Sequence, residues 1–213
     1  MHIQRIAEHV LEVRFANQPS EVVTRQIRAL KDRLEAHSIE GFQECVPAYL
    51  TLTVFFTGSY HQMLDRVMAL GRDLDVSALP SARTIEIPVC YAPEYGFDLV
   101  EVSRHTGLTP SEVIGLHSSG LYTVQMLGFM PGFPYLTGLD PRLQVPRRSS
   151  PRLKVPAGSV GLAGNQTGVY PLDLPGGWQI IGRTAVKLFD LQRDPPVLLS
   201  AGDHIQFIPV DQL

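Results

Sequence analysis

Basic side chains gather in one proline-rich stretch of the sequence. The segment from Pro146 to Pro156 holds no acidic residue and four basic ones, Arg147, Arg148, Arg152 and Lys154. Guanidinium groups bind carboxylates and phosphates through paired hydrogen bonds. The prolines stiffen the backbone, which lowers the entropy lost when an anion is held. We therefore expect an anion site here, with solvated loop charge as the alternative. Alanine at Arg148 or Arg152 should then weaken binding with little effect on the melting temperature.

His117 is the strongest titratable candidate for catalysis. We expect it at the C-terminus of a short helix, where the helix dipole favours the charged imidazolium form. It precedes a long run rich in glycine and proline, Gly128 to Arg183, which has the composition of ordered loops and short strands. The alternative is a histidine that only caps helix carbonyl groups.

Amide and aromatic side chains within that run are further candidates. Asn165 and Gln166 lie between glycines, and an amide offers both the donor and the acceptor needed to recognise another amide or a lactam. The alternative for both is turn formation. Arg183 follows an apolar strand, where a buried guanidinium needs a carboxylate or an anionic ligand. We expect Tyr135 and Tyr170 to wall the pocket.

Several well-known catalytic patterns are absent from the sequence. It contains no GxxxxGK[ST], GxGxxG, HExxH or GxSxG motif, so no cofactor or nucleotide motif can be named. Ser159 lacks the spacing of a nucleophile elbow, and we expect it to be structural. No spacing of histidines and carboxylates indicates a metal site. Cys45 and Cys90 have no CxxC spacing and are interpreted as buried free thiols.

Composition indicates an ordinary globular protein. The 213 residues are 44% hydrophobic and 18% charged, with a net charge of -3, which gives no reason to expect a nucleic-acid partner. The sequence has no apolar run long enough to span a membrane and no apolar leader at its start. We expect a cytoplasmic protein without a membrane partner.

The first part of the chain is predicted to be a compact α+β domain, residues 1–84. Glycine and proline are sparse there, and the boundary is expected between Pro80 and Pro93. Alternation at 11–15 predicts a strand, Ser20 and Ser59 begin amphipathic helices, and strands are expected at 41–46, 49–56 and 85–89. That βαββαβ order is typical of a ferredoxin-like sandwich with two helices on one face of its sheet.

The second part, residues 85–213, is predicted to be mainly β. Helices are expected at 97–105, stopped by Gly107, and after Thr109, where a capping box begins a helix that ends near His117. Only strands follow, at 122–129, 158–163, 167–170, 178–183, 186–189 and 204–209. Many short strands joined by glycine and proline loops favour a closed barrel or a sandwich.

Three long blocks resemble one protein family. They are GFMPGFPYL (128–136), PRRSSPRLKVPAGSVGLAGNQTGVYP (146–171) and PGGWQIIGRT (175–184). They are similar to the signature of the family of 5-oxoprolinase B subunits, also called allophanate hydrolase subunit 1, which includes the sporulation-kinase inhibitor KipI. The resemblance covers nearly the whole chain. The sequence departs from the family pattern at Ala92-Pro93, Leu174 and Ala185.

The resemblance implies a cyclophilin-like barrel and a part in the ATP-dependent opening of 5-oxoproline to glutamate. In that family the B-type protein acts with A and C subunits, and ATP with Mg²⁺ belongs to the complex. The resemblance supports a catalytic role for His117, and the amide chemistry of Gln166 suggests one for that residue. We expect the two to approach one another across the mouth of the barrel, with Tyr135 and Tyr170 lining it. We expect the chain alone to be inactive.

Two other functions remain open. One is inhibition of a sensor histidine kinase, as by KipI, and the other is a role like that of the related domains of urea amidolyase. Because the enzyme component and the kinase inhibitor share one family, no motif separates these two functions.

Overall fold

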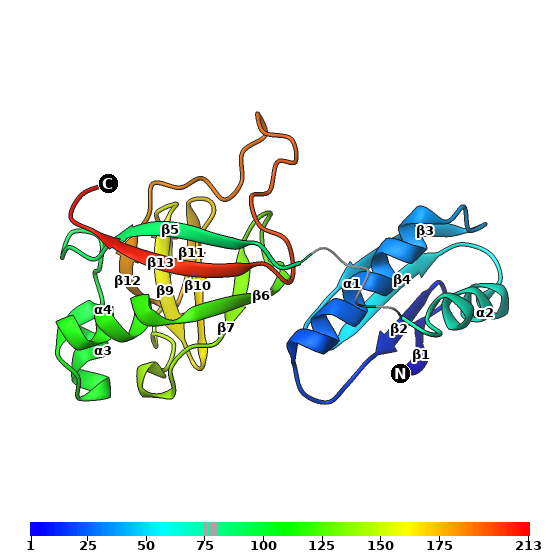
Figure 1. Cartoon of the computed structure of the whole chain (residues 1–213), viewed down its shortest axis with the longest axis horizontal. Helices are drawn as coiled ribbons and strands as arrows, with labels where there is room; N and C mark the ends of the chain where they lie inside the picture. The colour runs from blue at the N-terminus through cyan, green and yellow to red at the C-terminus, as the bar shows by residue number, and fades with distance from the viewer. Residues whose placement is uncertain (75, 77–80) are drawn as a thin grey trace. The chain divides into compact units, whose positions relative to one another are not determined.

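A computed structural model of the chain describes residues 1–74, 76 and 81–213. Contacts divide it into two compact units, Met1–Ser81 and Ala82–Leu213 (Figure 1). The division lies close to the predicted one after residue 84. Pro80, at the start of the predicted boundary, lies outside the described residues. No helix of the described part is both long enough and apolar enough to cross a membrane.

The first unit is a four-stranded antiparallel sheet with two helices. Its strands are β1 (His2–Ala7), β2 (Val10–Arg14), β3 (Phe42–Pro47) and β4 (Thr51–Phe56), in the spatial order β1-β2-β4-β3. Helix α1 (Glu21–Ala36) buries Val23, Ile27, Leu30 and Leu34, and helix α2 (Tyr60–Leu70) buries Met63 and Val67. Ser20 and Ser59 accept hydrogen bonds as N-caps, as predicted. The unit has its own apolar core and one buried free thiol, Cys45.

The predicted βαββαβ order is wrong. Strand β1 lies at one edge of this sheet, and the sequence pattern did not predict it. The order of elements in the first unit is therefore ββαββα. The predicted last strand, now β5 (Thr84–Cys90), pairs within the second unit instead. The ferredoxin-like description of residues 1–84 is therefore not confirmed.

The second unit is built around a closed seven-stranded barrel in the order β10-β7-β6-β13-β5-β12-β9. Its strands after β5 are β6 (Leu121–Leu127), β7 (Pro134–Thr137), β9 (Ser159–Ala163), β10 (Gln166–Val169), β12 (Gln179–Arg183) and β13 (His204–Val210). Strands β5 and β13 are parallel and their other neighbours are antiparallel. Every residue of β9 is buried, so its sequence SVGLA shows no alternation of apolar and polar residues. The mainly β prediction for this part is confirmed.

Two helices accompany the barrel. Helix α3 (Leu99–Thr106) packs on β12, and α4 (Pro110–Ser119) packs on β13. Gly107 ends α3 in the left-handed conformation, with φ 72°, as predicted. The capping box of Thr109 and Glu112 is present, and α4 runs two residues beyond the predicted end at His117.

Two short segments outside the barrel differ from the prediction. Strands β8 (Arg152–Val155) and β11 (Leu174–Gly176) form a separate two-stranded sheet that the sequence pattern did not predict. The predicted strand at 186–189 is wrong: only Phe189 makes an isolated bridge there, to Val197. A single-turn helix, η1 (Pro141–Leu143), precedes the basic segment.

Candidate functional site

The loop that holds the basic residues is fixed to the barrel at both sides of Arg147. The side-chain amide of Gln179 donates to the Pro146 carbonyl oxygen at 3.2 Å. The backbone N–H of Arg148 donates to the carbonyl oxygen of Gly177 at 2.8 Å. Pro146 is thus hydrogen-bonded to the start of β12, and Arg148 to the turn before it. Because both neighbours of Arg147 are held, the backbone that carries its guanidinium is fixed.

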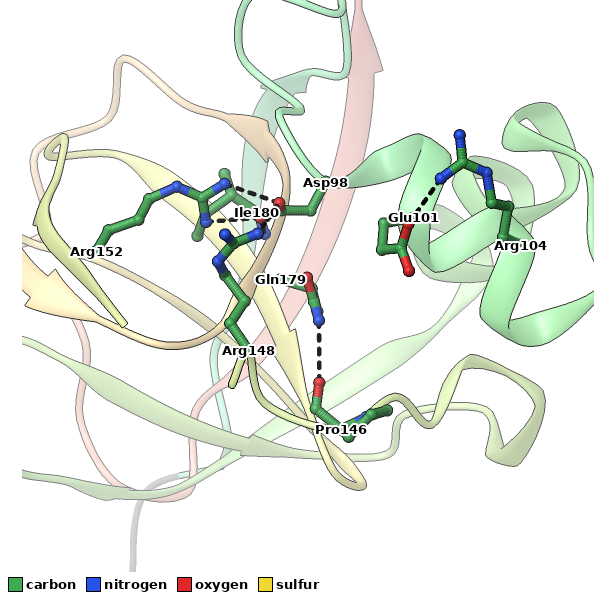
Figure 2. A network of polar contacts seen from close by, with 8 residues as sticks. All are labelled: Asp98, Glu101, Arg104, Pro146, Arg148, Arg152, Gln179 and Ile180. Carbon is green, nitrogen blue, oxygen red and sulfur yellow. Dashed lines mark hydrogen bonds and ion pairs between the residues drawn. The ribbon is translucent and has the colours of Figure 1, made fainter. Parts of the chain in front are cut away.

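Asp98 anchors the same loop through its carboxylate. Arg148 donates to Oδ1 at 2.8 Å, and Arg152 donates to Oδ1 at 2.7 Å and to Oδ2 at 2.8 Å (Figure 2). The backbone N–H of Ile180 donates to Oδ2 at 2.7 Å. The Asp98 side chain is 4% exposed, so its charge is largely withdrawn from water and satisfied by protein donors.

The backbone before α3 lets Asp98 reach this position. Its own N–H donates to the Ile180 carbonyl oxygen at 2.8 Å, so residues 98 and 180 are linked by both backbone and side chain. A Cβ at Gly96 would lie 2.5 Å from the carbonyl oxygen of Ile181, so only glycine permits this approach. Asp98 occupies the N-cap position of α3 but makes no side-chain capping bond, because its oxygens face Arg148, Arg152 and Ile180.

The six basic residues from 142 to 183 are therefore not equivalent. Arg148 and Arg152 share Asp98, Lys154 contacts Asp173 at 2.7 Å, and Arg142 contacts Asp140 at 2.7 Å. Arg183 donates from Nε to the Ala157 carbonyl oxygen at 2.9 Å. Arg147 is exposed and, among the residues that the structure describes, is the one of these six without a hydrogen-bond or ion-pair partner.

These contacts correct the expectation that the four basic side chains form one free anion site. Arg148 and Arg152 are structural ion pairs with a buried carboxylate, so their replacement should reduce stability as well as any binding. Arg147 is the side chain whose charge is available to a ligand.

An aromatic hollow of about 300 Å³ lies on one side of Arg147. Besides Arg147, its walls include Phe129, Phe133, Tyr135, Tyr170 and Trp178. Phe133 makes edge-to-face contacts with the other four rings, at centroid distances between 5.1 and 5.6 Å. The structure thus brings Tyr135 and Tyr170 together with Arg147 in one hollow.

The shape of this hollow depends on two unusual backbone positions. Phe129 has a φ of 68° and is 59% exposed, a conformation that costs free energy in a residue other than glycine. A Cβ at Gly176 would lie 2.2 Å from Tyr170 Oη, so glycine is required where that ring closes the hollow. Burial raises the pKa of Tyr170, although the Trp178 N–H and the charge of Arg147 oppose this, and the phenol stays protonated near neutral pH.

A second, polar hollow of about 510 Å³ at the start of α3 is also lined by Arg147. Its walls include Phe97, Glu101, Arg104, Arg147, Arg148 and Gln179. Glu101 and Arg104 form an ion pair at 2.9 Å on the exposed side of the helix (Figure 2). Arg147 is therefore shared by an aromatic hollow and a charged one.

His117 is not at the mouth of the barrel. Its side chain is fully buried and stacks on Phe207 at a centroid distance of 4.5 Å. Nε2 lies 2.9 Å from Oγ1 of Thr167, which itself donates to the Gly161 carbonyl oxygen, so Nε2–H is the donor to Thr167. Nδ1 then accepts from Tyr91 Oη at 2.8 Å. Both ring nitrogens are satisfied in the neutral tautomer.

Desolvation by burial lowers the pKa of His117 to about 3. The prediction that the helix dipole would favour its imidazolium form is therefore wrong, because burial outweighs the dipole. Nothing in this environment makes His117 an accessible general acid or base at neutral pH.

Gln166 does not pair with His117 as predicted. The partner of His117 on β10 is Thr167, and consecutive side chains of a strand point to opposite faces of the sheet. Asn165 is exposed in the two-residue turn with Gly164 that joins β9 to β10, which fits the alternative of turn formation. Ser159 is 1% exposed on β9, as expected for a structural residue. The catalytic roles of His117 and Gln166 stay predictions without support from this geometry.

Sequence reasoning missed two residues that define the site. Asp98 and Gln179 stand in ordinary local contexts, GFDLV and GGWQI, and neither forms a recognisable motif. A usable signal was present only for Asp98, since three arginines within six residues require a counter-charge if any of them is buried.

The chain was also compared with known proteins. The family model for the carboxyltransferase domain, subdomain C and D, matches residues 1–199. The chain is 41% identical over 227 residues to the B subunit of 5-oxoprolinase from Bacillus subtilis (strain 168), covering 99% of this chain and 93% of that protein. It is 49% identical over 168 residues to the B subunit of 5-oxoprolinase from Escherichia coli O157:H7, covering 78% and 77%.

Solved structures share the fold of this chain. The crystal structure of TTHA0988 matches all of this chain with a TM-score of 0.84 and 36% identity, and this chain spans 41% of that longer chain. The Kluyveromyces lactis urea amidolyase matches 98% of this chain with a TM-score of 0.76, over 15% of its own length. Its identity is only 20%, so it shows the shared fold alone.

Proposed function

The chain belongs to the family of 5-oxoprolinase B subunits, and on that premise we propose that it is the B component of a complex that opens 5-oxoproline to L-glutamate with ATP. The observation that carries the proposal is the 41% identity to a protein of that name over 99% of this chain. The complex would include A and C subunits. We also infer that the barrel is of the cyclophilin-like kind.

The chemistry of the reaction defines what this chain has to supply. A five-membered lactam is a stable amide, and phosphorylation of its oxygen would make its carbon open to attack by water. The substrate is a carboxylate, so its binding needs a cation that is not already neutralised by the protein. Arg147 meets this requirement, because its backbone is fixed and its guanidinium has no partner among the described residues.

ATP and Mg²⁺ are assigned to the complex and not to residues of this chain. In the part of the chain that the structure describes, no group of three or more His, Cys, Asp or Glu side chains is placed to hold a metal ion. Cys45 and Cys90 are free and buried, the state that a reducing cytoplasm maintains, and we place the complex there.

The test is reconstitution. The chain is to be co-expressed with candidate A and C subunits, and glutamate formed from 5-oxoproline and ATP is to be measured for the complex, for each pair and for this chain alone. We expect turnover from the complex and none from the single chain. Full turnover by the rigorously purified single chain would contradict the multi-subunit reading.

Inhibition of a sensor histidine kinase is the other outcome of this experiment. The kinase-inhibitor function would be favoured by two results together. The complex would assemble but form no glutamate, and a kinase mixed with this chain would lose autophosphorylation. A role in urea chemistry has less support, because the relatives named for urea chemistry match only 52% of this chain, at 28–30% identity.

A further inference from the structure

The polar hollow at the start of α3 has an excess of positive charge. Glu101 neutralises Arg104, while the single carboxylate of Asp98 is shared by Arg148 and Arg152. Arg147 adds a guanidinium that has no carboxylate partner among the described residues. The hollow and its supporting network therefore attract an anion, and Arg147 is the side chain free to bind it.

The amide of Gln179 indicates a second property of the ligand. Its Nε2 donates to the Pro146 carbonyl oxygen, and a flipped amide would place two oxygens against each other, so this bond sets which end of the amide faces Pro146. Figure 2 shows Oε1 directed away from Pro146, toward the side where Asp98 and Arg148 lie. Gln179 is 8% exposed, and its Oε1 is buried without a donor. A buried amide oxygen without a donor is costly, and a ligand N–H that reaches it as the side chain adjusts would remove that cost.

Helix α3 begins beside the polar hollow. Asp98 stands at its N-cap position but turns its carboxylate to Arg148, Arg152 and Ile180, so it makes no bond to the N–H groups of the first turn. Val100 and Glu101, in that turn, line the hollow. The first turn of α3 therefore borders the same hollow as Arg147.

We propose that the polar hollow binds the carboxylate end of a small lactam acid, with the carboxylate on Arg147 and the ring N–H on Oε1 of Gln179. This inference rests on the proposed function and locates its substrate. In 5-oxoproline the N–H and the carboxylate are attached to the same ring carbon. An acceptor and a cation that lie close together, such as Gln179 and Arg147, can therefore bind both groups at once. The phosphates of a nucleoside triphosphate could also bind the Arg147 guanidinium, but at neutral pH they offer no hydrogen-bond donor to Gln179.

The test is calorimetric titration of the full chain with four ligands: 5-oxoproline, its primary amide, N-methyl-5-oxoproline and ATP. The amide lacks the carboxylate charge, and the N-methyl compound lacks the ring N–H. We expect 5-oxoproline to bind, and the amide and the N-methyl compound each to bind about tenfold more weakly or worse. ATP should neither bind in the hollow nor displace 5-oxoproline.

Three variants assign the binding to these residues. Arg147→Ala and Gln179→Met should each weaken 5-oxoproline binding about tenfold. Arg142→Ala removes an exposed guanidinium that lines neither hollow and should leave binding unchanged. Trp178 fluorescence checks that each variant is folded, and Gln179→Asn provides a second, polar substitution if Gln179→Met is not.

Several results would overturn the inference. These are no binding of 5-oxoproline by the wild-type chain, equal binding of the N-methyl compound, equal binding by the Arg147 and Gln179 variants, or ATP binding that is lost in the Arg147 variant. The same variants are to be assayed in the reconstituted complex. Turnover that is insensitive to both substitutions would refute the location alone, whereas a wild-type complex without turnover would refute the proposed function.

Discussion

Replacement of Asp98 by asparagine should destabilise the barrel unit. The carboxylate accepts four hydrogen bonds of 2.7 to 2.8 Å, three from Arg148 and Arg152 and one from the Ile180 N–H. Asparagine has nearly the same shape, but it removes the negative charge and directs an NH₂ group at guanidinium donors. Both arginines would then be left without their counter-charge.

The magnitude follows from how far water can reach these cations. Loss of one partner of a buried ion pair costs about 3–5 kcal/mol. The side chains of Arg148 and Arg152 are 33% and 23% exposed, so solvent partly compensates them. We therefore expect a loss near the lower limit, about 3 kcal/mol of unfolding free energy, which corresponds to roughly 10 °C in melting temperature for a unit of this size.

The assay uses the single tryptophan of the chain. Trp178 lies in the barrel unit and is 5% exposed, so urea unfolding followed by its fluorescence reports on that unit. Arg147→Ala is the matched control from the same loop and should change stability by less than about 0.5 kcal/mol. A double-mutant cycle of Asp98→Asn with Arg152→Ala should show strong coupling, because the residues are in contact. An Asp98→Asn variant as stable as the wild type, or an Arg147→Ala variant as unstable as Arg152→Ala, would refute this reasoning.

Three other outcomes are expected. Burial lowers the pKa of His117 to about 3 from an ordinary value of 6.5. Between these two pH values the unfolded state binds a proton that the folded state excludes. The free energy of unfolding should therefore fall by about 1.4 kcal/mol for each pH unit as the pH drops from about 6.5 toward 3. His117→Gln should remove this part of the pH dependence, which urea unfolding of the wild type and the variant across that pH range would detect. If the unfolding free energies of the two proteins changed with pH in parallel, the pH dependence would not come from His117. Gly176→Ala should displace the Tyr170 ring, at a cost of about 1–3 kcal/mol, and close the aromatic hollow; an unchanged Trp178 spectrum and stability would contradict this. A fragment of residues 82–213 should fold alone with the urea midpoint of the barrel unit in the whole chain, and a fragment that stays unfolded would show that the two units depend on each other.

Local sequence signals were sufficient to predict helices whose ends carry capping residues. Ser20, Ser59 and Thr109 are N-caps and Gly107 is a C-cap, and each was predicted from residue type and the neighbouring pattern. Strand β1 was missed because its burial does not alternate: five of its six residues are exposed. Periodicity also predicted a strand at 85–89 but not its partners, so this strand was assigned to the wrong sheet.

The site was predictable in composition but not in its pairings. Glycines, prolines and arginines correctly marked the segment that contains Arg147, Tyr135 and Tyr170. The environment of His117 is made by Tyr91, Thr167 and Phe207, which are remote in sequence, and a helix end alone cannot show that they enclose it. The pairing of Asp98 with residues more than 45 positions later is equally invisible to local patterns.

The pairing of β5 with β13 has a consequence for how the protein is made. Thr84 to Cys90, the first strand of the barrel, lies parallel to His204 to Val210, the last, so the barrel cannot close until that last strand has left the ribosome. The sheet of residues 1–56 pairs strands that are close in sequence and can form much earlier. Until β12 and then β13 have emerged, the edges of β5 lack their partners, and an unpaired strand edge in a nascent chain is prone to aggregation. Synthesis rate and chaperone supply should therefore limit the yield of the barrel unit more than that of the first unit.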